Sequence, residues 1–223
     1  MVLQSVKVPP PLVPIFEQAE QYVNNFFDSF YCNKLEGTIT ISGERYILVN
    51  AKSLRLEFTK NLGETMGLNE AMAEEAADHF LYILAKSIGR ADAKKFAAQQ
   101  GVTDPLAKLA AGPISFNYSG WAFVDVFPES RLSQDDDFML IHDHPYSFEC
   151  HSFLSAKGAH SNKPVCIMNA GYSAGWTSGS FNMDLDTREI MCRARGDKAC
   201  RFVMGVKNKL DHHEEWVLNN IKR

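Results

Sequence analysis

The stretch that decides the fold of the C-terminal part is PVCIMNAGYSAGWTSGSFNMDLDTREIMCRARGDKACRF, residues 164–202. It holds three of the chain's five cysteines, Cys166, Cys192 and Cys200, together with the carboxylate Glu189. Glu189 and Cys192 are three residues apart and would share one face of a helical turn. Three thiolates and one carboxylate complete a tetrahedral Zn²⁺ site with no open position. The spacing therefore predicts a structural zinc site, and the alternative is that these cysteines are buried as small hydrophobic side chains.

The composition is that of an ordinary globular chain. Hydrophobic residues make up 45% and charged residues 22% of 223 positions, which favours one mixed domain with a terminal extension. A net charge of -4 and a pI near 6.0 argue against a broad nucleic-acid-binding face, so no direct nucleic acid contact is expected. No run of about 18 apolar residues and no signal-peptide core occur, which predicts no membrane span and a cytoplasmic location. An odd number of cysteines, five, argues against a disulfide framework.

The first hundred residues alternate between breaker-rich and periodic segments. Their patterns predict a proline-rich extended arm over 1–14, an amphipathic helix over 15–30 and a β-hairpin over 37–49. The helix over 15–30 must bury its apolar stripe on its own domain or on a second copy. A further helix begins at Asn69 and ends at Gly89, and another runs from Asp92 to Gly101. The first of these two helices carries its large apolar side chains on one face: Met72, Ala76, Phe80, Leu84 and Ile88.

The second half has the texture of short strands and turns. Strands are predicted over 121–127, 138–142, 165–168, 179–183 and 200–204, and helices over 147–154 and 210–223. The segment 171–179 is rich in glycine and is interpreted as an exposed turn beside the zinc loop.

Several motifs resemble one known domain. Ser147-Phe148-Glu149, Pro164-Val165-Cys166, residues 171–176, residues 189–192 and residues 196–202 are similar to the 4-vinyl reductase domain, with looser agreement back to residue 35. That domain also forms the effector-sensing region of bacterial activators that respond to phenol or xylene. The spacing of the three cysteines and Glu189 resembles the zinc-site spacing of that family.

The resemblance also implies a ligand pocket between a sheet and the helices of residues 69–110. The candidate lining residues are Phe116, Tyr118, Trp121, Phe123, His144, Tyr146 and Trp176, and each of them could instead be plain core. In phenol sensors of this family, a His and a Trp hold the phenol hydroxyl. Their positions are occupied here by Phe116 and His144, which favours a ligand other than phenol. His142 and His144 would point to one face of a strand, where they could bind a metal, or His144 alone could bond a ligand.

These observations predict an α+β fold: a mostly antiparallel sheet with packed helices, a ligand pocket and a C-terminal zinc-binding lobe. The expected organisation is an N-terminal arm and dimerisation helix over 1–34, a ligand-sensing domain over 35–160, a zinc-binding lobe over 161–205 and a linker helix over 206–223. A homodimer is expected, with the helix over 15–30 as the favoured interface.

The predicted function is a zinc-containing sensor of a small aromatic or hydrophobic ligand. It would regulate an attached or partner output module, such as a kinase, a cyclase or an ATPase-type activator. No nucleophile elbow, phosphate loop or dinucleotide fingerprint occurs, so a regulatory domain is favoured over an enzyme. Two alternatives stay open: a tetrapyrrole vinyl-reductase-type enzyme or accessory, and a vesicle-tethering-like scaffold that binds an acyl chain.

Overall fold

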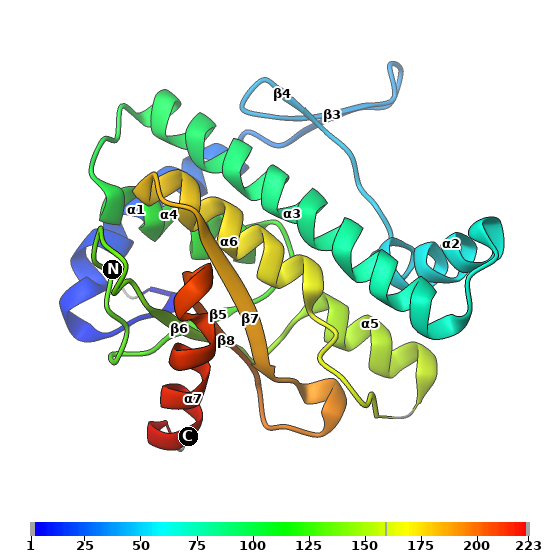
Figure 1. The fold of residues 1–223 in the computed structure, drawn as a ribbon. Coiled ribbons are helices and arrows are strands. Elements are labelled where there is room, and N and C mark those ends of the chain that lie inside the picture. The colour runs from blue at the N-terminus through cyan, green and yellow to red at the C-terminus, as the bar shows by residue number, and fades with distance from the viewer. Residues whose placement is uncertain (1–2, 159, 222–223) are drawn as a thin grey trace.

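The protein is built around a five-stranded sheet, seen in a computed structural model that describes residues 3–158 and 160–221 (Figure 1). Its strands are β1 (Val6–Lys7), β5 (Val124–Val126), β6 (Leu140–His144), β7 (Leu185–Met191) and β8 (Cys200–Val206), in the order β1-β5-β6-β8-β7. Only β1 and β5 pair in parallel, and the other neighbours are antiparallel. The α+β prediction is therefore confirmed, with one correction: the expected N-terminal arm contributes the edge strand β1.

Helices cover both faces of this sheet. On one face lie α1 (Val13–Asp28), α4 (Pro105–Tyr118) and α6 (Ile167–Phe181), with α3 (Glu70–Gln100) packed over α6 (Figure 1). The other face is covered by α7 (Leu210–Asn220), whose Val217 packs with Ile141 and Val203. Residues of a strand alternate between the two faces, so β6 turns Leu140, His142 and His144 toward the helices and Ile141 and Asp143 toward α7.

Close packing of α3 against α6 fixes the centre of the molecule. α3 runs unbroken through Gly89, because a side chain at Gly89 would stand 2.3 Å from the carbonyl oxygen of Tyr172 on α6. Gly171 and Gly175 on α6 touch the backbone of α3 in the same way. Three predictions are thus wrong: the helix end at Gly89, the exposed turn over 171–179, and the strands over 165–168 and 179–183. All these residues except 165, 166, 182 and 183 lie within the two packed helices.

The segment between α1 and α3 forms an outlying arm. β2 (Tyr31–Asn33), β3 (Thr38–Ile41) and β4 (Glu44–Tyr46) make a second, antiparallel sheet that stands off the body (Figure 1). The predicted hairpin is confirmed, but its second strand stops at Tyr46, and residues 47–49 are exposed. A π-helical turn (Ser53–Glu57) and α2 (Phe58–Met66) then lead back to α3.

The remaining elements largely follow the sequence patterns. The helix predicted over 15–30 is α1, and its apolar residues Phe16, Ala19 and Val23 are buried in the chain's own core. Residues 148–157 form α5 (Phe148–Lys157), and short 3-10 turns occupy Pro10–Leu12, Arg193–Arg195 and Lys207–Lys209. Residues 222–223 of the helix predicted over 210–223, and residues 1–2 of the arm, lie outside the described residues. Among the described residues, no helix combines the length and the apolar character needed to cross a membrane.

Candidate functional site

Four cysteines from different parts of the fold meet at one end of the sheet. Cys150 lies in α5, Cys166 precedes α6, Cys192 follows β7 and Cys200 begins β8. Their sulfur atoms all lie within 4.8 Å of one another, all four residues are buried, and none forms a disulfide. The sulfurs of Cys166 and Cys200 are 3.6 Å apart. Zn–S bonds of about 2.3 Å in a tetrahedron set sulfurs about 3.8 Å apart, so the four thiols fit a Zn²⁺ ion.

Glu189 lies beside this cluster and outside it. It belongs to strand β7, so the expectation that it shares a helical turn with Cys192 is wrong. One oxygen of its carboxylate accepts the backbone N–H of Cys166 at 2.7 Å, which holds the start of α6 against β7. Burial, and then the neighbouring Cys192, raise the pKa of Glu189 to about 8. The role of Glu189 as a ligand stays a prediction.

Cys150 is the member of the cluster that sequence reasoning missed. It follows Ser147, which caps α5 and whose hydroxyl lies 3.2 Å from the sulfur of Cys166. This contact places the first turn of α5, and with it Cys150, against the loop before α6. The residue spacing gave no sign of this, because Cys150 is the one cysteine of its helix and only tertiary packing decides whether it reaches the others.

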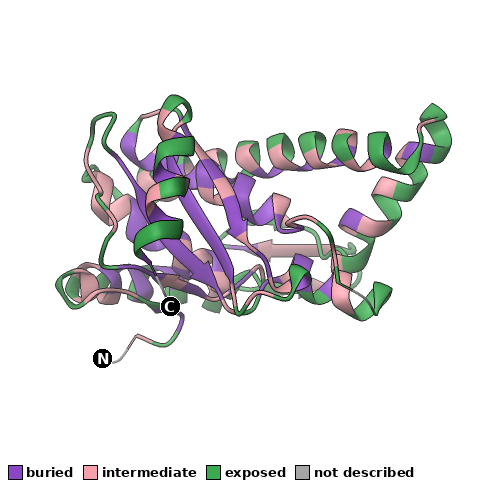
Figure 2. Ribbon diagram, turned by 60° about the horizontal axis from the view of Figure 1, so that its bottom comes forward, coloured by how far each residue is buried: buried purple, intermediate pink, exposed green. Residues whose placement is uncertain are grey.

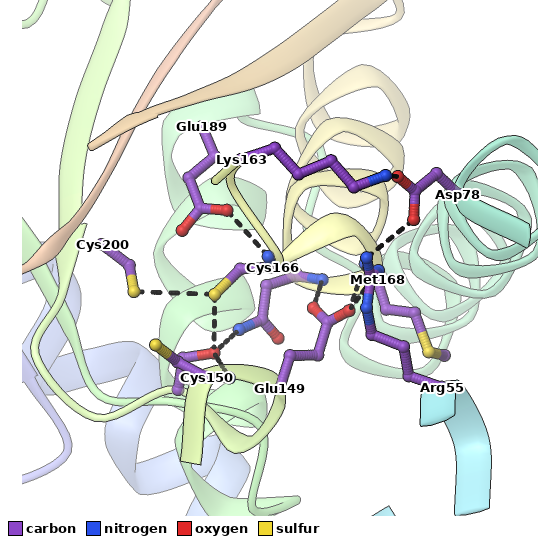
Figure 3. A network of polar contacts seen from close by, with 11 residues as sticks. Arg55, Asp78, Glu149, Cys150, Lys163, Cys166, Met168, Glu189 and Cys200 are labelled. Carbon is purple, nitrogen blue, oxygen red and sulfur yellow. Dashed lines mark hydrogen bonds and ion pairs between the residues drawn. The ribbon is translucent and has the colours of Figure 1, made fainter. Parts of the chain in front are cut away.

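A charged network surrounds the cluster on the α3 side (Figure 3). The buried carboxylate of Glu149 accepts the backbone N–H groups of Met168 at 3.0 Å and Asn169 at 2.8 Å, in the first turn of α6. Burial raises the pKa of Glu149 to about 8, although Arg55, 3.9 Å away, acts in the opposite direction. Arg55 also pairs with Asp78 of α3 at 2.7 Å. The network therefore ties the π-helical turn and α3 to the segment that carries Cys166.

A cavity of about 370 Å³ lies between α4, α6 and the inner face of the sheet. This volume is at the low end for small-molecule pockets and suits a single-ring ligand. The lining residues are mostly apolar or aromatic: Leu109, Gly112, Pro113, Phe116, Val124, Val126, Leu140, His142, Tyr172, Ser173, Trp176 and Thr177.

Two histidines of β6 are the unusual polar groups beside this cavity. His142 lines it, and His144 lies behind with its ring centroid 5.0 Å from that of His142. Both residues are buried, and none of their four ring nitrogens finds a hydrogen-bond partner among the described residues. Burial lowers the pKa of His142 to about 3 and holds that of His144 well below its usual value. Both rings are therefore neutral at pH 7, and each offers one donor and one acceptor.

Comparison with known proteins accounts for this architecture. Residues 147–206, which include all four cysteines, match the family model of the 4-vinyl reductase domain. The chain belongs to the 4-vinyl reductase domain family. The matched segment contains α5, α6, β7 and β8, so the family match covers the cysteine cluster and one wall of the cavity.

Two relatives extend the 4-vinyl reductase match toward the N-terminus. The phenol regulator MopR of Acinetobacter guillouiae is 27% identical over 204 residues, which cover 91% of this chain and 35% of MopR. The chain thus spans about a third of that relative's length. The crystal structure of the phenol-responsive sensory domain of the transcription activator PoxR with phenol superposes with a TM-score of 0.71. It is 21% identical and aligns over 91% of this chain and 97% of the sensory domain, which shows a shared fold.

The 4-vinyl reductase fold divides the predicted ligand residues into three groups. Phe116 and Trp176 line the cavity, and Trp121 and His144 pack against Phe116 with ring centroids 5.3 and 5.2 Å away. The other three lie elsewhere: Tyr118 hydrogen-bonds Asn24 near the surface, Phe123 contacts Tyr146 through the backbone, and Tyr146 is 73% exposed. The lining residues that sequence reasoning missed include His142 and Tyr172. The alternation of β6 was a usable signal for His142, because it shares the face of His144.

The buried histidine makes this 4-vinyl reductase fold sensitive to acid. The pKa of His142 is about 3 in the folded chain and near 6.5 when unfolded, so the unfolded chain binds more protons between these values. Stability therefore falls as pH falls below 6.5, by about 2 kcal/mol between pH 6.5 and 5 from this residue. We expect His142→Phe to lose less stability than the native chain between pH 7.5 and 5 in thermal melts. Equal losses in both proteins would contradict a buried, neutral His142.

Proposed function

We propose that this chain is a ligand-sensing domain that binds a small single-ring aromatic molecule in the cavity beside β6. The observation that carries the proposal is an aromatic-lined cavity with an unpartnered imidazole, that of His142, among the described residues of its wall. Buried polar groups are nearly always hydrogen-bonded, and an unsatisfied one costs roughly 1–3 kcal/mol. A ligand hydroxyl or similar neutral group would satisfy this ring. The relation to a phenol regulator supports the same ligand class.

A neutral ligand is favoured over an ionised one. His142 and His144 are the titratable side chains that β6 turns toward the cavity, and burial keeps both uncharged. A carboxylate ligand would be buried beside them without a counter-charge, which is unfavourable in an apolar cavity. The chain thus suits phenol-like compounds over benzoate-like ones, with the hydroxyl bonded to β6 rather than to position 116.

The binding experiment uses calorimetry with phenol, toluene and benzoate as probes. We expect phenol to bind more tightly than toluene, and benzoate to bind least. His142→Phe keeps the ring stacked on Phe202, so it should weaken phenol binding about 10-fold, one hydrogen bond's worth, while toluene binding changes little. His151→Phe, at an exposed histidine of α5, is the control and should bind phenol like the native chain. Phenol binding that is unchanged in His142→Phe would refute this role.

We further propose that the four cysteines hold a structural Zn²⁺ ion, with Glu189 as the fourth ligand in the alternative set. When bound, the ion would link α5, α6, β7 and β8 through bonds that exist only in the folded chain, so metal affinity adds to folding stability. Metal binding and ligand sensing would then be separate tasks of one fold. The output belongs to an attached or partner module, as in an activator, and a homodimer is the form in which such a domain would act.

Native mass spectrometry of the purified protein separates this function from its alternatives. One zinc per chain and a small aromatic adduct, or an empty cavity that takes up phenol, is the expected result. A long acyl chain in the cavity would instead favour a tethering scaffold, and a bound tetrapyrrole would favour a role in vinyl-group reduction.

A further inference from the structure

The long helix α3 presents an unpartnered apolar ridge to solvent. Its inner ridge is made mainly of small residues that pack on α6: Ala73, Ala77, Leu81, Ala85, Gly89 and Ala93, all buried. Its large apolar residues form an outer ridge, where Met72, Phe80, Leu84 and Ile88 are 52%, 53%, 50% and 37% exposed. Figure 2 shows the same helix green along much of its outer side. The face predicted from the sequence to be buried is therefore the face that the single chain leaves open.

Small residues explain why the inner ridge packs on α6. Glycines on α6 bring its backbone into van der Waals contact with α3, and only alanine and glycine fit between two helices at that distance. Phe80 or Leu84 could not occupy this contact. Their exposure therefore follows from the fold, and a row of apolar side chains this large marks an interaction surface.

The charges along α3 match a second copy of the same helix. The acidic residues Glu70, Glu74, Glu75 and Asp78 lie in its first half, and the basic residues Lys86, Arg90, Lys94 and Lys95 lie in its second half. Two such helices packed antiparallel bring the acidic half of each against the basic half of the other, whereas parallel packing opposes like charges. A two-fold axis near Leu84 also places Phe80 of one copy close to Ile88 of the other. A two-fold interface requires such self-complementarity.

We propose that the outer ridge of α3, from Met72 to Ile88, is the homodimer interface of this protein, with the two helices antiparallel. This inference rests on the proposed dimer and moves its contact from α1 to α3. The side chains Phe16 and Val23 of α1 are already buried in the chain's own core, which leaves α1 without the apolar stripe that the sequence offered. Ligand sensing in the cavity does not depend on this surface.

The test measures the mass of the full chain in solution by light scattering, over a range of concentrations. Leu84→Asp and Phe80→Asp are both at exposed positions, so the fold is retained, and each should convert the dimer to a monomer with at least a 100-fold weaker association. Leu218→Asp on α7 is the matched control, because Leu218 is 54% exposed and lies on a different helix, and it should stay dimeric. A native chain that is monomeric throughout, or a dimer that survives Leu84→Asp, overturns the proposal.

Charge reversal tests the antiparallel orientation. Glu75 and Lys94 are exposed, one in each half of α3. Glu75→Lys alone and Lys94→Glu alone should each weaken the dimer, and the two changes together should restore part of the loss, because opposite charges again occupy the two halves. Additive weakening in the double variant overturns the antiparallel packing.

Phenol binding by the monomeric Leu84→Asp chain separates the two hypotheses. Retained binding leaves the sensor proposal standing whatever happens to the interface. A native dimer that dissociates on Leu84→Asp but never binds phenol would support the interface and count against the sensor alone.

Discussion

Replacing Cys150 by serine is expected to abolish zinc binding and to lower the melting temperature by roughly 10 °C. The sulfur of Cys150 lies within 4.8 Å of the other three cysteine sulfurs, so its loss leaves three buried thiols and an incomplete coordination shell. Breaking a buried charged cluster by removing one member costs about 3–5 kcal/mol. For a chain of this length, each kcal/mol corresponds to about 2–4 °C. Metal analysis and thermal melts of the same sample measure both effects.

Two further variants decide which residues are ligands. Glu189→Gln keeps an oxygen that can accept the N–H of Cys166, so it should retain one zinc per chain if the four cysteines are the ligands. Cys32→Ser, at the exposed fifth cysteine, should change neither zinc content nor melting temperature. If Glu189→Gln loses the metal and Cys150→Ser keeps it, the ligand set is the one that the sequence spacing suggested. A well-folded native chain without any metal would remove both sets.

Gly175→Ala is expected to destabilise the protein by about 3 kcal/mol or more, because it overpacks a contact between two backbones. A side-chain carbon at Gly175 would stand 2.0 Å from the carbonyl oxygen of Lys86 and 2.9 Å from the backbone nitrogen of Arg90. Neither atom can move without separating α3 from α6. Alanine otherwise favours a helix by about 1 kcal/mol over glycine, so any measured loss must come from the clash. Urea denaturation gives this difference directly.

Gly179→Ala is the matched control for this experiment. It lies on the same helix, but its added carbon would meet the side chain of Ala93 at 3.0 Å rather than backbone. A small shift can relieve that contact, so we expect a change of less than about 1 kcal/mol. Equal stability of Gly175→Ala and the native chain would show that α3 and α6 are not held at this distance.

Periodicity alone predicted much of the fold. α1, the β3–β4 hairpin, α5 and β8 each arise from patterns of the correct period or from a capping residue such as Ser147. The prediction for the glycine-rich segment 171–179 was wrong because glycine has two uses that look alike in one sequence. It can break a helix, or it can let two helices touch. Which use applies depends on the residues opposite, here on α3, and those are far away in the sequence.

The candidate site shows the same division. Three of the four clustered cysteines could be predicted from residue types, spacing and the family resemblance. Cys150 could not, because only the packing of α5 onto the loop before α6 brings it there. Likewise, the aromatic residues around 116–121 indicated an apolar centre, whereas the exposure of Tyr146 and the place of His142 in the cavity wall depend on strand register.

Strand β6 has a different neighbour on each of its faces. On one side, His142 borders the cavity. On the other, the carboxylate of Asp143 holds Arg201 through two hydrogen bonds of 2.8 and 2.9 Å, and Arg201 reaches the carbonyl oxygen of Ile221 directly after α7. Adjacent residues of one strand thus touch the ligand space and the anchor of the last described helix. A displacement of β6 by a fraction of an ångström would act as a lever whose two arms are only one peptide unit apart.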